Sequence, residues 1–394
     1  MNDKTMEMRL NEVLKRAVEN KEAAGINLLI LKDGKEIAYT EAGFSNMEAK
    51  KPFERDAILR MYSMSKPITG AAVMLLVERG LISLGESVSK YLSGFKDLKI
   101  NMEDGTSLPV GRQIFIRDLM SMTSGLPYGY SEGCPTEQKV QKLFDKIDEK
   151  LYTDDALKTV DIANALGEIG VMFRPGDYWQ YGTSADVLGA IVEVVTGMRF
   201  GDFLKKEFFE PLDMKDTAFF VPMEKQERLA EAYERKDGEL HLFKTNHLGL
   251  KYMRTEDPHF QSGGAGLCST IDDYSHFAMM LINNGSYNGK QILSPATVKY
   301  MTHGRLTPWQ QKKMWYDWDG HAGYSYGCLM QHMIEPEMSY FNTYMDEYGW
   351  DGWLGTYFCN SPSNGLSIIM GMQISNPDGN TIFEKVRNTL ATLV

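Results

Sequence analysis

The stretch Met61-Tyr62-Ser63-Met64-Ser65-Lys66-Pro67 stands directly before a long apolar run, residues 68–81 (ITGAAVMLLVERGL). If the run is a helix that begins in this stretch, Ser63 and Lys66 share one face, because residues three apart are neighbours on a helix. A serine hydroxyl is a weak nucleophile until a base removes its proton. A partly desolvated lysine one turn away is able to act as that base or to tune it. Spacing excludes Ser65, because only Ser63 stands one turn before Lys66.

The order of the predicted elements indicates an α/β fold. Strand-like runs flank the Asp33-Gly34 turn, the end of the chain is again rich in strands, and the middle has helical periodicity. We expect an antiparallel sheet flanked by helices and assembled from both chain ends, with a mainly helical domain inserted. The sheet domain is predicted to comprise residues 1–85 and about 260–394, and the helical domain about 86–259. Near the end, 303–322 are predicted to form a surface loop and 324–330 one strand.

The composition argues against several classes of function. The chain has 394 residues and a formal net charge of −11, which disfavours nucleic acid and anionic membranes as partners. The four cysteines are scattered without metal-ligand spacing, so no metal or cofactor is expected and the thiols are predicted to be free. The N-terminus is charged and no apolar run reaches about 18 residues, so we expect a cytoplasmic protein without a membrane span. A G-x-S-x-G elbow is absent, which argues against an α/β-hydrolase.

A third functional group is needed beside the serine and the lysine, to orient groups or relay protons. Tyr181 is the best candidate, because it lies in a Gly-flanked turn just before the predicted helix 185–196. A phenol near an ammonium group has a lowered pKa and exchanges protons readily. Each motif is weak alone: S-x-x-K occurs by chance, and a tyrosine before a helix more often serves packing.

Four segments strengthen the interpretation because their motifs occur together, and in this order, in one superfamily. They are Ser63-Met64-Ser65-Lys66 (S-x-x-K), residues 119–126 (LMSMTSGL), residues 175–183 (PGDYWQYGT) and residues 263–270 (GGAGLCST). The chain resembles the serine β-lactamase and penicillin-binding-protein superfamily, most closely its class C-like branch and the family VIII carboxylesterases. The resemblance covers most of the chain. It implies a β-lactamase/transpeptidase-like fold and a catalytic set of Ser63, Lys66 and Tyr181.

Two departures from the superfamily pattern bear on the substrate. Thr183 stands where the Y-x-N motif usually has an Asn that contacts a substrate amide, which puts an amide contact in doubt. The third motif, usually K-T-G or H-x-G, is replaced by Trp350-Asp351-Gly352, similar to the W-G-G of the family VIII esterases. The cation that would bind a substrate carboxylate is therefore missing. If Asp351 points inward, it repels such a carboxylate.

The resemblance also assigns the remaining site residues. The oxyanion hole would consist of the backbone N–H groups of Ser63 and Trp353, with Gly352 permitting close backbone approach. Trp350, Asp351, Gly352, Thr183 and Tyr128 are the predicted substrate-binding residues. For Trp350 and Trp353 core packing is an equal alternative to a pocket wall, and for Tyr128 packing or an exposed loop is at least as good.

The sequence thus predicts a serine hydrolase that acts through an acyl-enzyme on small neutral carboxylic esters. The same site would also suit a β-lactamase, a D-amino-acid peptidase, another amide hydrolase or an acyltransferase. An alternative of another class is a catalytically silent member that binds a ligand. Whether Lys66 or Tyr181 is the general base stays open, because their titrations are coupled. The sequence predicts no oligomeric state.

Overall fold

One eight-stranded sheet is the centre of the computed structural model, which describes residues 3–375 and 381–392. The strand order is β12-β13-β14-β15-β16-β1-β2-β3, and all neighbouring strands are antiparallel. The strands are β1 (Gly25–Lys32), β2 (Lys35–Asn46), β3 (Lys51–Pro52), β12 (Tyr324–Gly327), β13 (Met330–Met333), β14 (Tyr348–Asp351), β15 (Tyr357–Ser361) and β16 (Leu366–Met372). The pairing of β1 with β16 places Ile26 opposite Met372, so the predicted assembly from both chain ends is confirmed.

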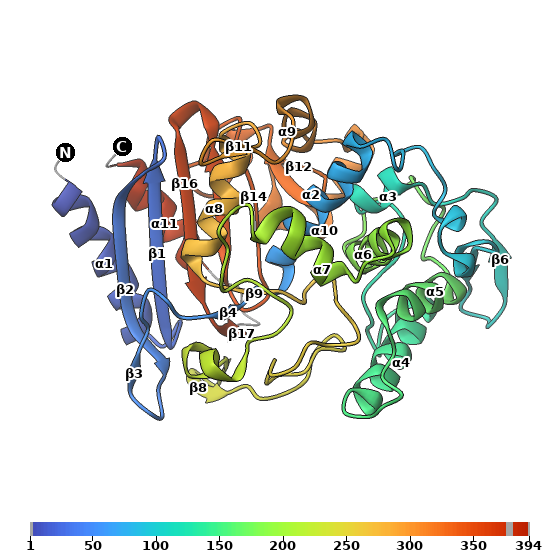
Figure 1. The fold of residues 1–394 in the computed structure, drawn as a ribbon, viewed down its shortest axis with the longest axis horizontal. Coiled ribbons are helices and arrows are strands. Elements are labelled where there is room, and N and C mark those ends of the chain that lie inside the picture. The colour runs from blue at the N-terminus through green and yellow to red at the C-terminus, as the bar shows by residue number, and fades with distance from the viewer. Residues whose placement is uncertain (1–2, 376–380, 393–394) are drawn as a thin grey trace.

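Both faces of this sheet are covered by helices (Figure 1). On one face lie α1 (Asp3–Glu19) and α11 (Ile382–Ala391), which pack against each other, and on the other lies α8 (Ile271–Ile282). Alternate residues of β1 serve the two cores: Leu28 joins the core under α1 and α11, whereas Leu29 joins the core under α8. A strand buried on both faces reads as a continuous apolar run, which is the pattern of residues 28–31.

Helices fill the middle of the chain. They are α2 (Ser65–Glu78), α3 (Ile116–Met120), α4 (Pro135–Lys150), α5 (Thr159–Ile169), α6 (Ser184–Thr196) and α7 (Phe200–Leu204), the last continued by a π-helical turn (Lys205–Phe209). The predicted helix after Lys66 is confirmed as α2. Because α2 packs against α6 and one hydrophobic core extends from the sheet into this helical part, the proposed domain boundaries stay a prediction.

Small sheets of two or three short strands lie outside the main sheet. They are β4 (Leu59–Arg60) with β9 (Cys268–Ser269), β5 (Lys99–Asn101) with β6 (Ser107–Pro109), β10 (Ser286–Tyr287) with β11 (Lys290–Gln291), and β7 (Tyr233–Lys236) with β8 (Glu239–Leu242) and β17 (Ile374–Ser375). The pairing of β4 with β9 continues into a hydrogen bond from the Met61 N–H to the Leu267 carbonyl, 2.9 Å long. These bonds bring the glycine-rich turn at 263–266 next to the turn that carries Ser63.

The segment 303–333 differs from its sequence prediction in two ways. Residues 303–322 are not a surface loop, because they contain α10 (Pro308–Asp317), a 3-10 turn and buried contacts; α9 (Pro295–Met301) precedes them. Residues 324–330 are not one strand, because a tight turn separates β12 from β13. Cys328 and Leu329 make this turn with φ values of 49° and 62°, a conformation usually signalled by Gly or Asn. Without that signal, the turn could not be recognised from the sequence.

No helix within residues 3–375 and 381–392 combines the length and the apolar character needed to cross a bilayer.

Candidate active site

Ser63 lies in a single 3-10 turn, Tyr62–Met64, that runs directly into α2. The preceding Tyr62 has a φ of 44°, in the left-handed region that is costly for a bulky residue. Its ring contacts those of His247 and Trp353 at centroid distances of 5.7 and 5.1 Å. This packing holds the turn in a strained conformation and presents the Ser63 hydroxyl to a cavity.

Lys66 is fully buried directly behind Ser63. Its Nζ lies 3.1 Å from Ser63 Oγ, 2.9 Å from the Tyr128 hydroxyl and 2.9 Å from the Gly264 carbonyl oxygen. Burial disfavours the ammonium form and lowers the pKa of Lys66 to about 7, although the charges of Asp186 and Asp351 act in the opposite direction. A lysine in this state is partly unprotonated at neutral pH and is placed to accept the serine proton.

Tyr181 lies on the other side of Ser63. Its hydroxyl is hydrogen-bonded to Ser63 and accepts a hydrogen bond from Trp350 Nε1 at 3.0 Å. Lys66 Nζ lies 4.6 Å from the centroid of the Tyr181 ring. Burial raises the pKa of Tyr181 well above that of an ordinary phenol, and these two hydrogen bonds only moderate the effect. The lowered pKa expected from the sequence is therefore wrong, and Tyr181 is a phenol that carries its proton in the free protein.

A second layer of groups fixes the lysine. The Asp186 carboxylate, in the first turn of α6, accepts hydrogen bonds from Ser262 Oγ at 2.5 Å and from the Gly264 N–H at 3.0 Å. The same Gly264 offers its carbonyl to Lys66. Sequence reasoning missed this layer, although an acidic residue inside the apolar run of α6 was a usable signal.

The structure divides the predicted substrate-binding residues into two groups. Asp351 and Gly352 line the cavity, whereas Trp350 is buried behind Tyr181, which it supports through its indole N–H. Thr183 is also buried, and its hydroxyl donates to the Pro127 carbonyl at 3.3 Å. Trp350, Thr183 and Tyr128 do not line the cavity. The Tyr128 hydroxyl accepts a hydrogen bond from Lys66.

The loop after β14 is shaped to approach the serine closely. A Cβ atom on Gly352 would lie 2.4 Å from the Met61 carbonyl oxygen and 2.1 Å from Thr356 Oγ1, so a larger residue does not fit. The next residue, Trp353, stacks on His247 at 4.2 Å. Among the described residues, none accepts a hydrogen bond from the Trp353 backbone N–H. A free N–H beside a glycine that permits close approach is what an oxyanion hole requires.

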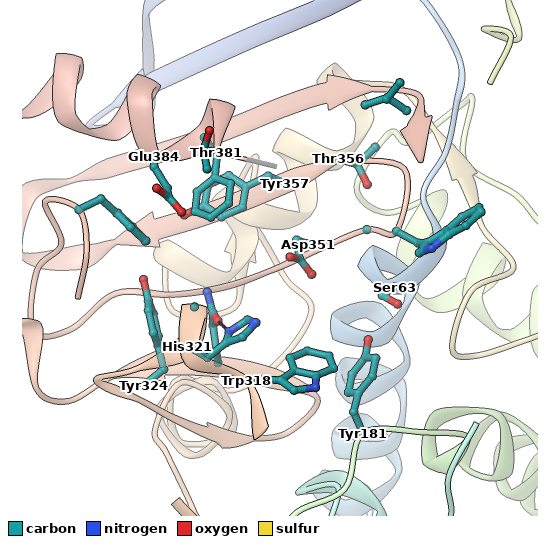
Figure 2. A pocket seen from close by; sticks show the side chains of 18 residues that line it. Ser63, Tyr181, Trp318, His321, Tyr324, Asp351, Thr356, Tyr357, Thr381 and Glu384 are labelled. Carbon is teal, nitrogen blue, oxygen red and sulfur yellow. Dashed lines mark hydrogen bonds between the residues drawn. The ribbon is translucent and has the colours of Figure 1, made fainter. Parts of the chain in front are cut away.

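A cavity of about 490 Å³ opens from this point (Figure 2). Ser63 and Tyr181 lie at one end, Asp351 lies in the middle, and Tyr357, Thr381 and Glu384 lie toward the other end. Trp318 lines the wall beside Tyr181, with 4.7 Å between ring centroids. Trp318, His321 and Glu384 were not predicted as site residues. Three tryptophans within 309–318 could have indicated a site residue at Trp318. The polar residues of the same segment led instead to the prediction of a surface loop.

Asp351 and His321 face the same part of the cavity. Burial raises the pKa of Asp351, while the nearby His321 and Lys66 act to lower it. Burial lowers the pKa of His321, and its Nδ1 is 2.6 Å from Gln331 Oε1. Among the described residues no group of three or more His, Cys, Asp or Glu side chains is arranged to hold a metal ion. The cavity therefore combines an acid, an imidazole and aromatic walls.

Comparison with known proteins agrees with this geometry. A family model described as beta-lactamase matches residues 10–391. Protein Rv1367c of Mycobacterium tuberculosis is 28% identical over 357 residues, which cover 89% of this chain and 86% of that protein. Esterase EstB of Burkholderia gladioli is 30% identical over 278 residues, 67% of each chain. The solved structure of EstCE1, a hydrolase with promiscuous acyltransferase activity, matches with a TM-score of 0.82 at 22% identity, over 98% of this chain and 99% of that one.

Proposed function

The chain belongs to the beta-lactamase family and is a serine hydrolase, and on this basis we propose that it hydrolyses small neutral carboxylic esters through an acyl-enzyme on Ser63. The observation that carries the proposal is the buried Lys66 amine, 3.1 Å from Ser63 Oγ and with a pKa lowered to about 7. A base that is partly unprotonated at neutral pH activates a serine without help from a histidine.

The acylation step follows from the hydrogen bonds. The neutral Lys66 amine takes the proton of Ser63 as Oγ attacks the ester carbonyl, and the resulting ammonium donates to Gly264 and Tyr128. The oxyanion is held by the N–H groups of Ser63 and Trp353. Tyr181 gives its proton to the departing alkoxide and becomes a phenolate, which the Lys66 ammonium near its ring stabilises.

Deacylation restores both groups. The Tyr181 phenolate takes a proton from water, and the hydroxide formed attacks the acyl carbonyl. When the carbon–Oγ bond breaks, Ser63 recovers its proton from the Lys66 ammonium and the acid is released. In this scheme Lys66 is the base of acylation and Tyr181 the acid, because burial moves their pKa values in opposite directions.

The choice of esters over β-lactams rests on charge. The described lining of the cavity contains no lysine or arginine. Trp350 stands at the position where the superfamily motif has its cation, and Asp351 follows it. A β-lactam or peptide carboxylate would meet Asp351 at close range and be repelled. The similarity of the chain to Esterase EstB also supports an ester substrate.

The test is hydrolysis of p-nitrophenyl butyrate by Ser63→Ala, with Ser65→Ala as the matched control. Ser65 Oγ only accepts a hydrogen bond from the Leu267 N–H at 3.1 Å, so its loss should leave turnover within about tenfold of wild type. Ser63→Ala should lose turnover by about a thousandfold or more and should no longer react with a fluorophosphonate probe. Equal activity of Ser63→Ala and wild type, or nitrocefin turnover comparable to ester turnover, contradicts the proposal.

Acyl transfer is a second candidate, favoured by the likeness to EstCE1, a hydrolase with promiscuous acyltransferase activity. An acyl-enzyme is attacked by an alcohol as readily as by water if the acceptor fits the cavity. Adding a small alcohol to the butyrate assay separates the two. A rate gain with formation of the new ester assigns transfer, and an unchanged rate with free butyrate as the sole product assigns hydrolysis.

A further inference from the structure

The cavity is acidic from its middle to the end remote from Ser63. Its described lining includes the carboxylates of Asp351, in the middle, and Glu384, toward that end, but no lysine or arginine. Lys385, whose charge acts to lower the pKa of Glu384, forms an ion pair with Glu22. Among the described residues, no group of another residue hydrogen-bonds to the Asp351 carboxylate, and none forms a hydrogen bond or ion pair with Glu384. Figure 2 shows Asp351 in the middle of the cavity and Glu384 toward the end that is remote from Ser63. Two acids without partners along one cavity favour a positively charged occupant.

The neighbouring titratable groups do not cancel this charge. His321 faces Asp351, but burial lowers the pKa of His321, and its ring is stacked on Trp350 at 5.5 Å. Burial thus favours the uncharged form of this imidazole, although the charge of Asp351 acts in the opposite direction. Lys66 is the other cationic group that acts on Asp351, yet its three hydrogen bonds hold it on the far side of Ser63. Asp351 thus gains stabilisation from an added cation in the cavity.

Aromatic side chains form a large part of the remaining wall. Ring faces attract cations through their quadrupole, and a cage of aromatic rings with a carboxylate is a general device for binding ammonium groups. A bulky ammonium group also has apolar methyl or methylene surface that these rings bury. The aromatic lining residues concerned are Trp318, Tyr324, Phe341, Trp353, Tyr357 and Phe383.

We propose that the ester substrate carries an ammonium group, quaternary or protonated, which lies between Asp351 and Glu384 while its carbonyl carbon lies at Ser63. This inference rests on the proposed esterase function and narrows it, since the substrate should carry a positive charge as well as lack a negative one. The charge and the aromatic wall define a class of substrate.

Two pairs of isosteric esters test the inference in the intact enzyme. For the acyl part, p-nitrophenyl 4-(trimethylammonio)butanoate is compared with p-nitrophenyl 5,5-dimethylhexanoate. For the alcohol part, butyrylthiocholine is compared with its 3,3-dimethylbutyl thioester isostere. Each pair has the same shape and differs only in charge. We expect kcat/KM to favour the cationic member of one pair by about tenfold, and the pair that responds tells which part of the ester enters the acidic end.

Variants assign the preference to the two acids. Asp351→Asn should bring the ratio of cationic to neutral kcat/KM to about one, and Glu384→Gln should reduce it less. The control Glu337→Gln removes an exposed acid outside the cavity and should leave the ratio unchanged. The ratio is independent of the amount of folded enzyme, and thermal unfolding followed by circular dichroism reports whether each variant folds.

The outcomes distinguish failure of this inference from failure of the proposed esterase function. Ratios at or below one for both pairs in the wild type overturn the inference, and so does a preference that Asp351→Asn and Glu384→Gln leave intact. In either case, hydrolysis of the neutral esters that depends on Ser63 leaves the esterase function standing. Hydrolysis of every ester that survives Ser63→Ala overturns the function itself.

Discussion

The two ends of the cavity are built on different principles. At the serine end the catalytic side chains are held by protein partners: Lys66 has three, and Tyr181 is bonded to both Ser63 and Trp350. At the acidic end, the carboxylates of Asp351 and Glu384 have no hydrogen-bond or ion-pair partner among the described residues. The reacting groups are therefore arranged before the substrate arrives. The carboxylates proposed for recognition gain their partner only when the substrate binds. The four predictions below test this division, beginning with the largest effect.

The largest effect is expected from Lys66→Met. This variant keeps the apolar stem and removes the buried amine that we propose as the base, so kcat/KM for p-nitrophenyl butyrate should fall by about 10³-fold. Lys205→Met, at an exposed position, is the matched control and should retain wild-type activity. A rise in KM alone, with kcat preserved, would mean that Lys66 contributes to substrate binding, and would contradict its role as base.

The pH dependence is expected to follow the Lys66 amine. Because its pKa is lowered to about 7, kcat/KM should rise with pH through about 7 and then level off as the amine loses its proton. The charge of Asp186 raises the pKa of Lys66, so Asp186→Asn should move this acidic limb to lower pH. Asp213→Asn, an exposed substitution, is the control and should leave the limb in place. A limb that Asp186→Asn leaves unmoved or shifts upward contradicts the assignment.

Trp350→Phe tests a residue that supports the serine end from behind Tyr181. The variant keeps an aromatic ring and removes the indole N–H that donates to the Tyr181 hydroxyl at 3.0 Å. One lost hydrogen bond to a reacting group, about 1.5 kcal/mol, corresponds to roughly a tenfold fall in kcat. If KM rises instead and kcat is unchanged, Trp350 acts on the substrate directly, as the sequence had suggested, and the division between the two ends fails there.

The smallest effect is expected from Thr183→Val. The Thr183 hydroxyl donates to the Pro127 carbonyl and does not reach the cavity, so the loss should lower stability by about 1 kcal/mol and change kcat/KM by less than about threefold. Thermal unfolding and the butyrate assay measure the two effects. A change in specificity between amide and ester substrates would restore Thr183 to the substrate-binding set predicted from the sequence.

The sequence could predict those contacts of the site that are made by residues close together in the chain. Ser63 and Lys66 are three residues apart on a continuous helical path, so a sequence pattern is sufficient to bring them together. The lysine's other partners, Tyr128 and Gly264, are 62 and 198 positions away, and no local pattern specifies such contacts. The direction of the Tyr181 pKa shift was misjudged for the same reason, since burial outweighs charge there and burial is a property of the whole fold.

The fold was predictable where the pattern of apolar residues is strong and unpredictable where it is weak. The apolar run of β1 and the helix α2 were foreseen, and the antiparallel sheet from both chain ends is confirmed. The polar segment that contains α10 was misread as a loop. Its helix is held by the capping box of Thr307 and Gln310 and by the bond from Gln310 to the Gly176 carbonyl, not by an apolar face.

The pairing of β1 with β16 also determines when this protein can become active during its synthesis. The central strand near residue 26 finds its partner near residue 372. At ribosomal rates of about 5–20 residues per second, the nascent N-terminal hairpin waits roughly 15–70 seconds before its neighbour emerges. Throughout that interval β1 presents an apolar, unpaired edge, which is the kind of surface that chaperones cover. Hydrolytic activity should therefore appear only after residues 366–372 have been synthesised and have paired with β1.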